Sequence, residues 1–211
     1  INNEELDTTY MDEFEVTGNK TAVTKVISWG NNNWSNMAAA FKDCTNLTEL
    51  PSASNIFKAG SASLSQFIHG CTSLTELDMT GWDLSSGTGT NLYYFAFNCT
   101  NLQKVVFKNK DVKLSTSTPR IFQGVGTNVA NGCEFDMEGL NFTGTCNDMN
   151  TWFITARAKV GSNFSNWRFN QSVTNLSLVS LFNQLKFVDT SAVLNMSGWT
   201  DCNAVLRSWR N

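Results

Sequence analysis

A short motif recurs three times in this chain at nearly constant spacing. Its copies read AFKDCTNLTELP at 40–51, FIHGCTSLTELDM at 67–79 and AFNCTNLQKVVF at 96–107. The cysteines of the three copies are almost evenly spaced, and a leucine occupies the third position after each cysteine. A near-constant period of this kind, kept through several copies, predicts a solenoid in which each repeat contacts only its neighbours.

Later segments continue the repeat in a weaker form. The sequence LNMSGWTD at 194–201 matches LDMTGWDL at 77–84, and residues 166–170 have the pattern of another strand. We align Leu77/Met79, Val105/Phe107, Phe135/Met137, Trp167/Phe169 and Leu194/Met196 as the inward pairs of successive strands. The positions that we expect to fill the interior are apolar or cysteine: Phe41, Cys44, Leu47, Leu50, Cys71, Leu74, Leu77, Met79, Trp82, Cys99, Leu102, Val105, Phe107, Phe135, Met137, Phe169, Leu194, Met196 and Trp199.

Each unit also contains a short apolar segment that we interpret as a helix. These segments lie at 36–41, 64–70, 91–97, 149–158, 176–184 and 202–209. Several of them follow Ser, Thr, Asn or Asp, whose side chains can cap a helix. Because neither so short a helix nor a five-residue strand is stable alone in water, the units must stack on one another. Over 26–211 we expect an α/β repeat fold, a right-handed solenoid of about seven short helix–strand units with a single parallel sheet.

Residues 1–25 differ from the repeats and have two interpretations. Acidic residues are frequent up to Glu15, and apolar residues then flank a Gly18-Asn19 turn. A β-hairpin here would cover the open end of the stack, as solenoids require. The alternative is the tail of a preceding domain, and the sequence does not decide between the two.

Charged residues occupy the outward positions of the expected strands and alternate in sign from one strand to the next. The candidates for a ligand-contacting sheet face are Glu76, Asp78, Lys104, Lys108, Glu134, Asp136 and Arg168. We favour a role in sheet cohesion, because opposite charges on neighbouring strands stabilise the pairing. A face built for one charged partner would not alternate its sign.

The cysteines and the single histidine favour a protein without a catalytic or metal site. Cys44, Cys71 and Cys99 share one repeat position, so we expect them to be buried and to act as small hydrophobic residues. A disulfide between neighbouring repeats would be sterically possible but is not required. The chain has no C-x-x-C pair, and His69 is its only histidine, so we expect neither zinc nor a Cys–His or Ser–His nucleophile. No cofactor is expected either, because no glycine-rich phosphate loop is present.

The composition makes two further classes of partner improbable. With 15 Lys and Arg against 18 Asp and Glu, the net charge of −3 does not suit a nucleic-acid binder. The longest apolar run, Leu92–Phe97, is far too short to cross a membrane, so we expect no direct membrane insertion. Binding is expected on the loops at 52–63, 84–91, 109–119, 126–132 and 159–165. Exposed aromatic residues such as Tyr93, Tyr94 or Trp209 are candidates to stack on sugars, although such residues more often fill a core.

The segment VISWGNNNWSNMAAAFKDCTNLTELP, followed by HGCTSLTELDMTGWD, resembles the BspA-like leucine-rich-repeat surface proteins of bacteria. The matching positions are Trp34, Met37, Phe41, Cys44, Leu47, Leu50, Cys71, Leu74, Leu77, Asp78, Met79, Trp82, Leu194, Asn195, Met196, Ser197 and Trp199. The agreement is good over 26–107, weak over 108–175 and better again after 176. The resemblance implies a leucine-rich-repeat solenoid, without catalytic residues, that is displayed outside the cell or carried on a phage particle.

These observations favour a non-enzymatic binding function. The leading hypothesis is an extracellular adhesion module of a bacterial surface protein that binds a protein or glycan on a cell or matrix surface, alone or as part of a larger chain or assembly. The first alternative is a phage tail-fibre or capsid-decoration protein on the virion that recognises the host surface. The second alternative is a structural spacer or assembly subunit.

Overall fold

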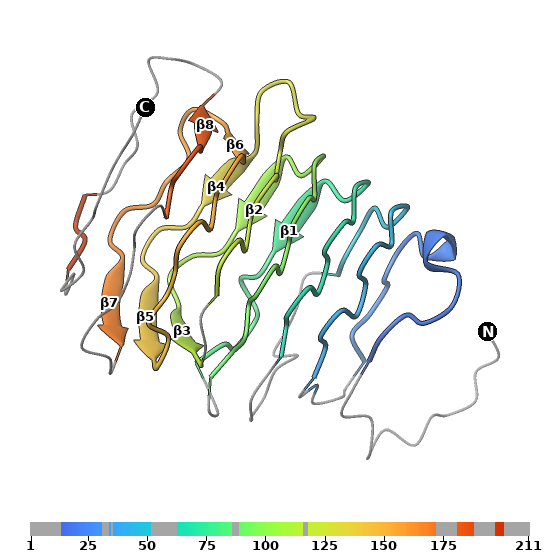
Figure 1. Cartoon of the computed structure of the whole chain (residues 1–211), viewed down its shortest axis with the longest axis horizontal. Coiled ribbons are helices and arrows are strands. Elements are labelled where there is room, and N and C mark those ends of the chain that lie inside the picture. Colours follow the sequence, from blue (N-terminus) through green and yellow to red (C-terminus); the bar gives the residue numbers. More distant parts are fainter. Residues whose placement is uncertain are drawn as a thin grey trace.

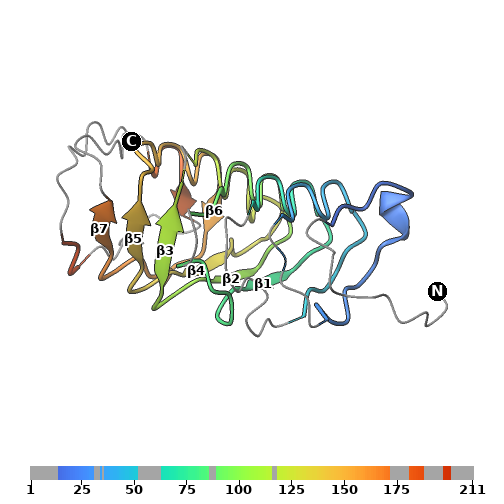
Figure 2. The same ribbon diagram turned by 90° about the horizontal axis from the view of Figure 1, so that it is seen from below.

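In the computed structural model the chain is a parallel β-solenoid whose coils stack along one axis (Figures 1 and 2). The structure describes residues 14–30, 34, 36–51, 63–85, 89–115, 118–171, 181–187 and 197–200. Successive coils lie side by side, so that residues at equivalent positions of successive repeats are neighbours in space.

The first sheet follows the repeat that the sequence analysis identified. It contains β1 (Glu76–Asp78), β2 (Lys104–Val106) and β4 (Glu134–Asp136), paired in parallel. Leu77 pairs with Val105 and Val105 with Phe135, as we expected from the alignment of inward residues. All three side chains are buried, because alternate residues of a strand point to the same side of the sheet.

A second sheet lies along another side of the coils, where we expected no sheet. It contains β3 (Asp111–Leu114), β5 (Asn141–Gly144) and β7 (Arg168–Gln171). A shorter parallel pair joins β6 (Arg157–Ala158) to β8 (Lys186–Phe187), and these are the remaining strands among the described residues. The prediction of a single parallel sheet is therefore wrong, and so is the alignment of Phe169 with Phe135, because Phe169 pairs with Phe142.

The third side of the coils consists of turns in place of the expected helices. We call this side the turn face; its turn segments are 38–43, 65–70, 93–98, 119–124 and 150–155. Each segment has two residues with positive φ, four positions apart, such as Ala39 at 56° and Asp43 at 61°. The only helix among the described residues is the 3-10 helix η1 (Lys20–Ala22). The leucine-rich-repeat solenoid of seven helix–strand units is therefore contradicted.

The hydrogen bonds of the turn face explain why these segments are not helical. The N–H groups of Ala39 and Phe41 donate across to Ser65 and Phe67 of the next coil, at 2.7 and 2.9 Å. The N–H group of Ala40, which lies between them, donates within its own segment to Met37, at 3.2 Å. This alternation needs residues with positive φ, which cannot belong to a right-handed helix. The left-handed conformation costs a non-glycine residue about 1–2 kcal/mol.

The turn segments have the same apolar spacing as an amphipathic helix, and this similarity caused the error. Met37, Ala40, Phe41 and Cys44 are all buried, which is the i, i+3, i+4, i+7 pattern of a helix. A run of turns with a left-handed residue at every fourth position brings the same positions inward. Of the other expected helices, 149–158 ends in β6, and residues 176–180 and 202–209 lie outside the described part of the chain.

Glycine and Asp or Asn alternate at one left-handed position of the turn face. The column consists of Asp43, Gly70, Asn98 and Gly124, one residue from each successive coil. The side-chain oxygens of Asp43 and Asn98 lie so close to Gly70 and Gly124 that a Cβ atom on either glycine would clash with them. These two glycines therefore combine a positive φ with a close approach of the neighbouring coil.

The core is a column of apolar side chains and thiols between the three sides. Phe67 and Phe95 stack with ring centroids 5.6 Å apart, and Cys71 and Cys99 each donate from Sγ to a carbonyl of the preceding coil. Of the residues that we placed in the interior, Leu50 and Trp199 are partly buried, and Leu194 and Met196 lie outside the described residues. The rest are buried: Phe41, Cys44, Leu47, Cys71, Leu74, Leu77, Met79, Trp82, Cys99, Leu102, Val105, Phe107, Phe135, Met137 and Phe169.

The first described residues continue the stack at its N-terminal end. The N–H groups of Phe14 and Val16 donate to Asn36 and Ala40, at 3.2 and 2.9 Å, in the same direction as the bonds of the turn face. The ring of Phe14 contacts Phe41. This part of the N-terminal region thus packs on the first turn segment, and residues 1–13 lie outside the described part.

Candidate binding surfaces

Most of the charged residues that we proposed as a ligand face alternate in sign across the outer side of the first sheet. Lys104 is in register with Glu76 on one side and with Glu134 on the other. Lys108 forms an ion pair with Asp136, and this hydrogen bond raises the pKa of Lys108. Opposite charges that face each other across strands stabilise the pairing.

Of the two remaining candidates, Asp78 lies on the same face and Arg168 does not. Asp78 is in register with Val106 and accepts a hydrogen bond from the N–H group of Thr80, at 2.8 Å. Arg168 lies on the second sheet, where it pairs with Asn141. The seven residues therefore do not form one surface.

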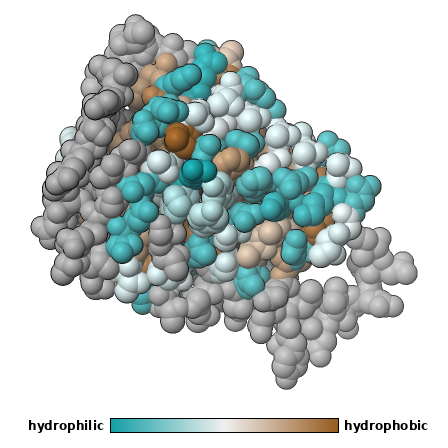
Figure 3. Space-filling model, viewed as in Figure 1, coloured by the Kyte–Doolittle hydropathy of each residue, from teal (hydrophilic) through white to brown (hydrophobic). Residues whose placement is uncertain are grey.

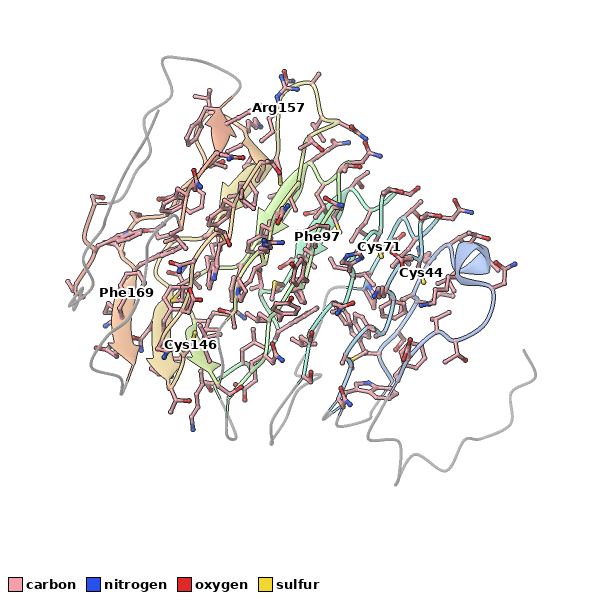
Figure 4. The ribbon with its side chains drawn as sticks, viewed as in Figure 1. Cys44, Cys71, Phe97, Cys146, Arg157 and Phe169 are labelled. Atoms are coloured by element: carbon pink, nitrogen blue, oxygen red, sulfur yellow. The ribbon has the colours of Figure 1, made fainter. Side chains whose placement is uncertain are left out.

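The turn face carries a cluster of aromatic residues beside a cation, which we call the aromatic–arginine patch. It consists of His69, Tyr93, Tyr94, Phe97 and Arg120, from three successive turn segments. His69 and Phe97 stack at 4.9 Å between ring centroids, and Tyr94 lies 4.9 Å from Phe97. Phe97 is labelled near the middle of this side in Figure 4.

Arg120 is held in place by an aromatic residue. Its Nη1 atom donates to the hydroxyl oxygen of Tyr94 at 2.7 Å, and its guanidinium carbon lies 5.6 Å from the centre of the same ring. Arg120 is exposed, and among the described residues no carboxylate lies within ion-pair distance of it. The patch thus presents an oriented cation that has no anionic partner in the described chain.

The other groups of the patch limit what it can do chemically. Tyr93 is 37% exposed, and a side-chain hydrogen bond with Tyr94 raises its pKa, so its phenol stays neutral. His69 is paired through Nδ1 with Asp43 at 3.3 Å. On the side of the molecule seen in Figure 3, small hydrophobic areas lie among polar ones.

The sequence analysis considered these residues separately and did not find the patch. Tyr93 and Tyr94 were candidates to stack on sugars, and His69 was weighed only as a metal ligand or catalytic base. A signal was available, because His69 and Phe97 occupy equivalent positions of neighbouring repeats, and so do Tyr94 and Arg120. Aligning the outward positions of the turn segments would have brought them together.

A polar groove lies at one corner of the coils, where the 126–132 loop projects beyond its neighbours (Figure 1). Two adjoining hollows, of about 530 and 370 Å³, share Thr75, Gln103, Val129 and Asn131 in their lining. The sequence analysis had included 126–132 among five candidate binding loops. In contrast, part of 109–119 is not a loop, because residues 111–114 form β3.

The thiols are sequestered in the core and do not form a reactive site. Cys44, Cys71, Cys99, Cys133 and Cys146 are free and buried, which confirms the prediction for the stacked cysteines. Burial raises the pKa of Cys99 to about 12 and raises the pKa of the other four thiols as well. The described residues contain no group of His, Cys, Asp and Glu that could hold a metal ion, and no helix long and apolar enough to span a bilayer.

Comparison of the chain with models of protein families, with curated proteins and with solved structures found no match. The resemblance to BspA-like proteins therefore stays a prediction from the motif, and the arguments for function rest on the surfaces described above.

Proposed function

We propose that this chain is a non-enzymatic, extracellular adhesion module that binds a protein partner on a cell or matrix surface through the aromatic–arginine patch. The observation that carries the proposal is Arg120, an exposed cation oriented by Tyr94 and without an anionic partner in the described residues. Tyr and Arg are the residue types enriched where a protein interface concentrates its binding energy.

The geometry of the rings favours a protein over a sugar as the partner at this patch. A sugar that stacks on an aromatic residue needs an open ring face. Here His69 and Phe97 lie face to face with only 4° between their planes, and the Arg120 guanidinium covers Tyr94. The exposed Arg120 guanidinium remains available, and a carboxylate side chain of a protein can bind it with two parallel hydrogen bonds.

The charges elsewhere on the coils support the assignment to the patch. On the outer side of the first sheet, charges of opposite sign alternate between strands, and a partner would have to displace the Lys108–Asp136 and Lys159–Glu134 ion pairs. Arg120 has no ion pair in the described chain that a partner's carboxylate would have to displace.

Binding of the labelled, folded protein to two panels tests the proposal. One panel holds animal matrix proteins, and the other holds intact bacterial cells with their isolated surface glycans. We expect saturable binding to at least one matrix protein, and we expect Arg120→Glu or Tyr93→Ala to weaken it about tenfold or more. Arg168→Glu is the matched control, since it makes the same charge change on the second sheet.

Two outcomes would contradict the adhesion proposal. Binding to the bacterial panel alone would favour the phage host-recognition alternative. If the protein bound to neither panel, the structural spacer or assembly subunit would be the better hypothesis.

A further inference from the structure

The polar groove is lined by side chains from three successive coils. The projecting 126–132 loop forms its wall. Ser73 and Thr75 belong to one coil, Asn101 and Gln103 to the next, and Asn131 to the projecting loop of the third. Strands of a sheet stack about 4.8 Å apart, which is close to the length of one sugar ring in an extended chain. The groove thus offers similar polar groups at a regular interval along the solenoid axis.

The wall of the groove is held rigidly. Arg157 donates from Nη1 to the carbonyl of Val129 at 3.2 Å, and the N–H group of Gly132 donates to the same residue at 3.0 Å. The N–H group of Asn128 donates to Thr100 of the preceding coil, also at 3.0 Å. Figure 4 shows Arg157 beside the projecting loop. Little conformational entropy is lost when a ligand binds to a surface that is ordered beforehand.

The chemistry of the lining is neutral and able both to donate and to accept hydrogen bonds. Among the described residues, the side chains of Ser73, Thr75, Gln103 and Asn131 have no hydrogen-bond partner in the protein. Hydroxyl and carboxamide groups both donate and accept, as adjacent sugar hydroxyls do. Val129 adds an apolar surface against which the C–H face of a sugar can pack.

The charges at one end of the groove are already matched. Lys159 pairs with Glu134 at 3.0 Å, and Lys104 is in register with both Glu76 and Glu134. The groove therefore presents no excess charge of either sign to a ligand.

We propose that the polar groove is a second binding site, which takes a neutral oligosaccharide lying along the solenoid axis. It is independent of the aromatic–arginine patch in its residues, its chemistry and its place on the coils.

Titration with defined oligosaccharides tests this site directly. The neutral probes are cellohexaose, maltohexaose, chitohexaose and mannohexaose, and a hyaluronan hexasaccharide is the acidic probe. Binding is followed by calorimetry and by the side-chain amide resonances of Gln103 and Asn131. We expect at least one neutral probe to bind saturably and to shift these two resonances, and the acidic probe to bind more weakly.

Substitutions separate this site from the patch. Gln103→Ala and Asn131→Ala should each weaken binding of the neutral probe about 2- to 10-fold, the effect of losing one neutral hydrogen bond. Both residues are exposed, so circular dichroism should show an unchanged fold. The matched control Tyr93→Ala should leave saccharide binding unchanged.

Three results would overturn the proposal: no binding of any neutral probe, unchanged affinity in both groove variants, or tighter binding of the acidic probe. None of them bears on adhesion to matrix proteins, which is measured with other ligands and with the patch variants.

Discussion

The turn face and the first sheet belong to the same coils, but they join one coil to the next in different ways. In the sheet, β1, β2 and β4 pair in register, and side chains of opposite charge face each other on the outside. On the turn face, left-handed residues free every second N–H group to reach the next coil, and three successive segments bring aromatic side chains together beside Arg120. The sheet thus matches its own surface charges, whereas the turn face leaves Arg120 unmatched and available to a partner.

The largest expected difference between the two sides concerns their interior side chains. Phe95 is fully buried behind the turn face and stacks on Phe67, so Phe95→Ala should lower the free energy of unfolding by about 3–5 kcal/mol. Val105 is equally buried behind the sheet but smaller, and Val105→Ala should cost about 2 kcal/mol. Urea unfolding followed by tryptophan fluorescence measures both. Equal losses would contradict the view that the aromatic column dominates the packing of the turn face.

The second prediction concerns the backbone of the turn face. Gly124 has a φ of 73°, and a Cβ atom there would meet the side-chain oxygen of Asn98. Gly124→Ala should therefore cost about 2–3 kcal/mol. Asn98→Gly in the same chain removes the oxygen and tolerates the left-handed backbone, so the double variant should recover about half of the loss. Strict additivity of the two substitutions in urea unfolding would show that the two positions do not touch.

The third prediction concerns the corner beyond the first sheet. The Lys110 ammonium donates to the carbonyl oxygens of Met79 and Trp82, at 2.6 and 2.8 Å, and burial lowers the pKa of Lys110 to about 8. Between pH 8 and the ordinary value of 10.5, the unfolded chain then binds the lysine proton and the folded chain does not. This group therefore makes the protein more stable as the pH rises through that window.

Comparison with Lys110→Met isolates this contribution. The free energy of unfolding of the original protein, minus that of the variant, should increase by about 1–3 kcal/mol from pH 8 to pH 10.5. A difference that stays flat, or that falls, would mean that the carbonyl groups keep Lys110 protonated throughout this range.

The smallest expected effects on stability come from reversing a single charge on the first sheet or on the turn face. Lys104→Glu places a like charge between Glu76 and Glu134 and should cost about 0.2–1 kcal/mol. Arg120→Glu on the turn face removes the exposed hydrogen bond and cation–π contact with Tyr94 but breaks no ion pair and creates no like-charge pair in register, so it should cost about 0.5 kcal/mol, no more than Lys104→Glu. If thermal unfolding showed the reverse order, the assignment of cohesion to the sheet and recognition to the turn face would fail.

The sequence was sufficient to predict the repeat and the positions that share a side. The spacing of Cys44, Cys71 and Cys99 indicated a solenoid, and the register of Leu77, Val105 and Phe135 followed from the same alignment. Such inferences succeed because a stack of similar coils places equivalent residues next to one another. Part of the polar groove could be predicted from the sequence, because the longer spacing between Val105 and Phe135 indicates an insertion before β4.

The second sheet and the aromatic–arginine patch were not predicted, for different reasons. Strands β3 and β5 have only four residues each, which is too short for alternation to stand out from a polar loop. The patch depends on three turn segments whose conformation was misassigned as helical, and this placed Tyr94 and Arg120 on helix surfaces without a defined neighbour.

The amino-acid sequence by itself determined that the chain repeats, which side chains are buried and that the cysteines lie inside. Only the tertiary structure decided between a helix and a run of turns. Both conformations bury the i, i+3, i+4, i+7 positions, so periodicity cannot separate them. They differ in the partner of each N–H group, which in the turn face is often a carbonyl on the next coil, a full repeat away along the chain. That long-range choice also sets which outward side chains meet, and hence where a partner can bind.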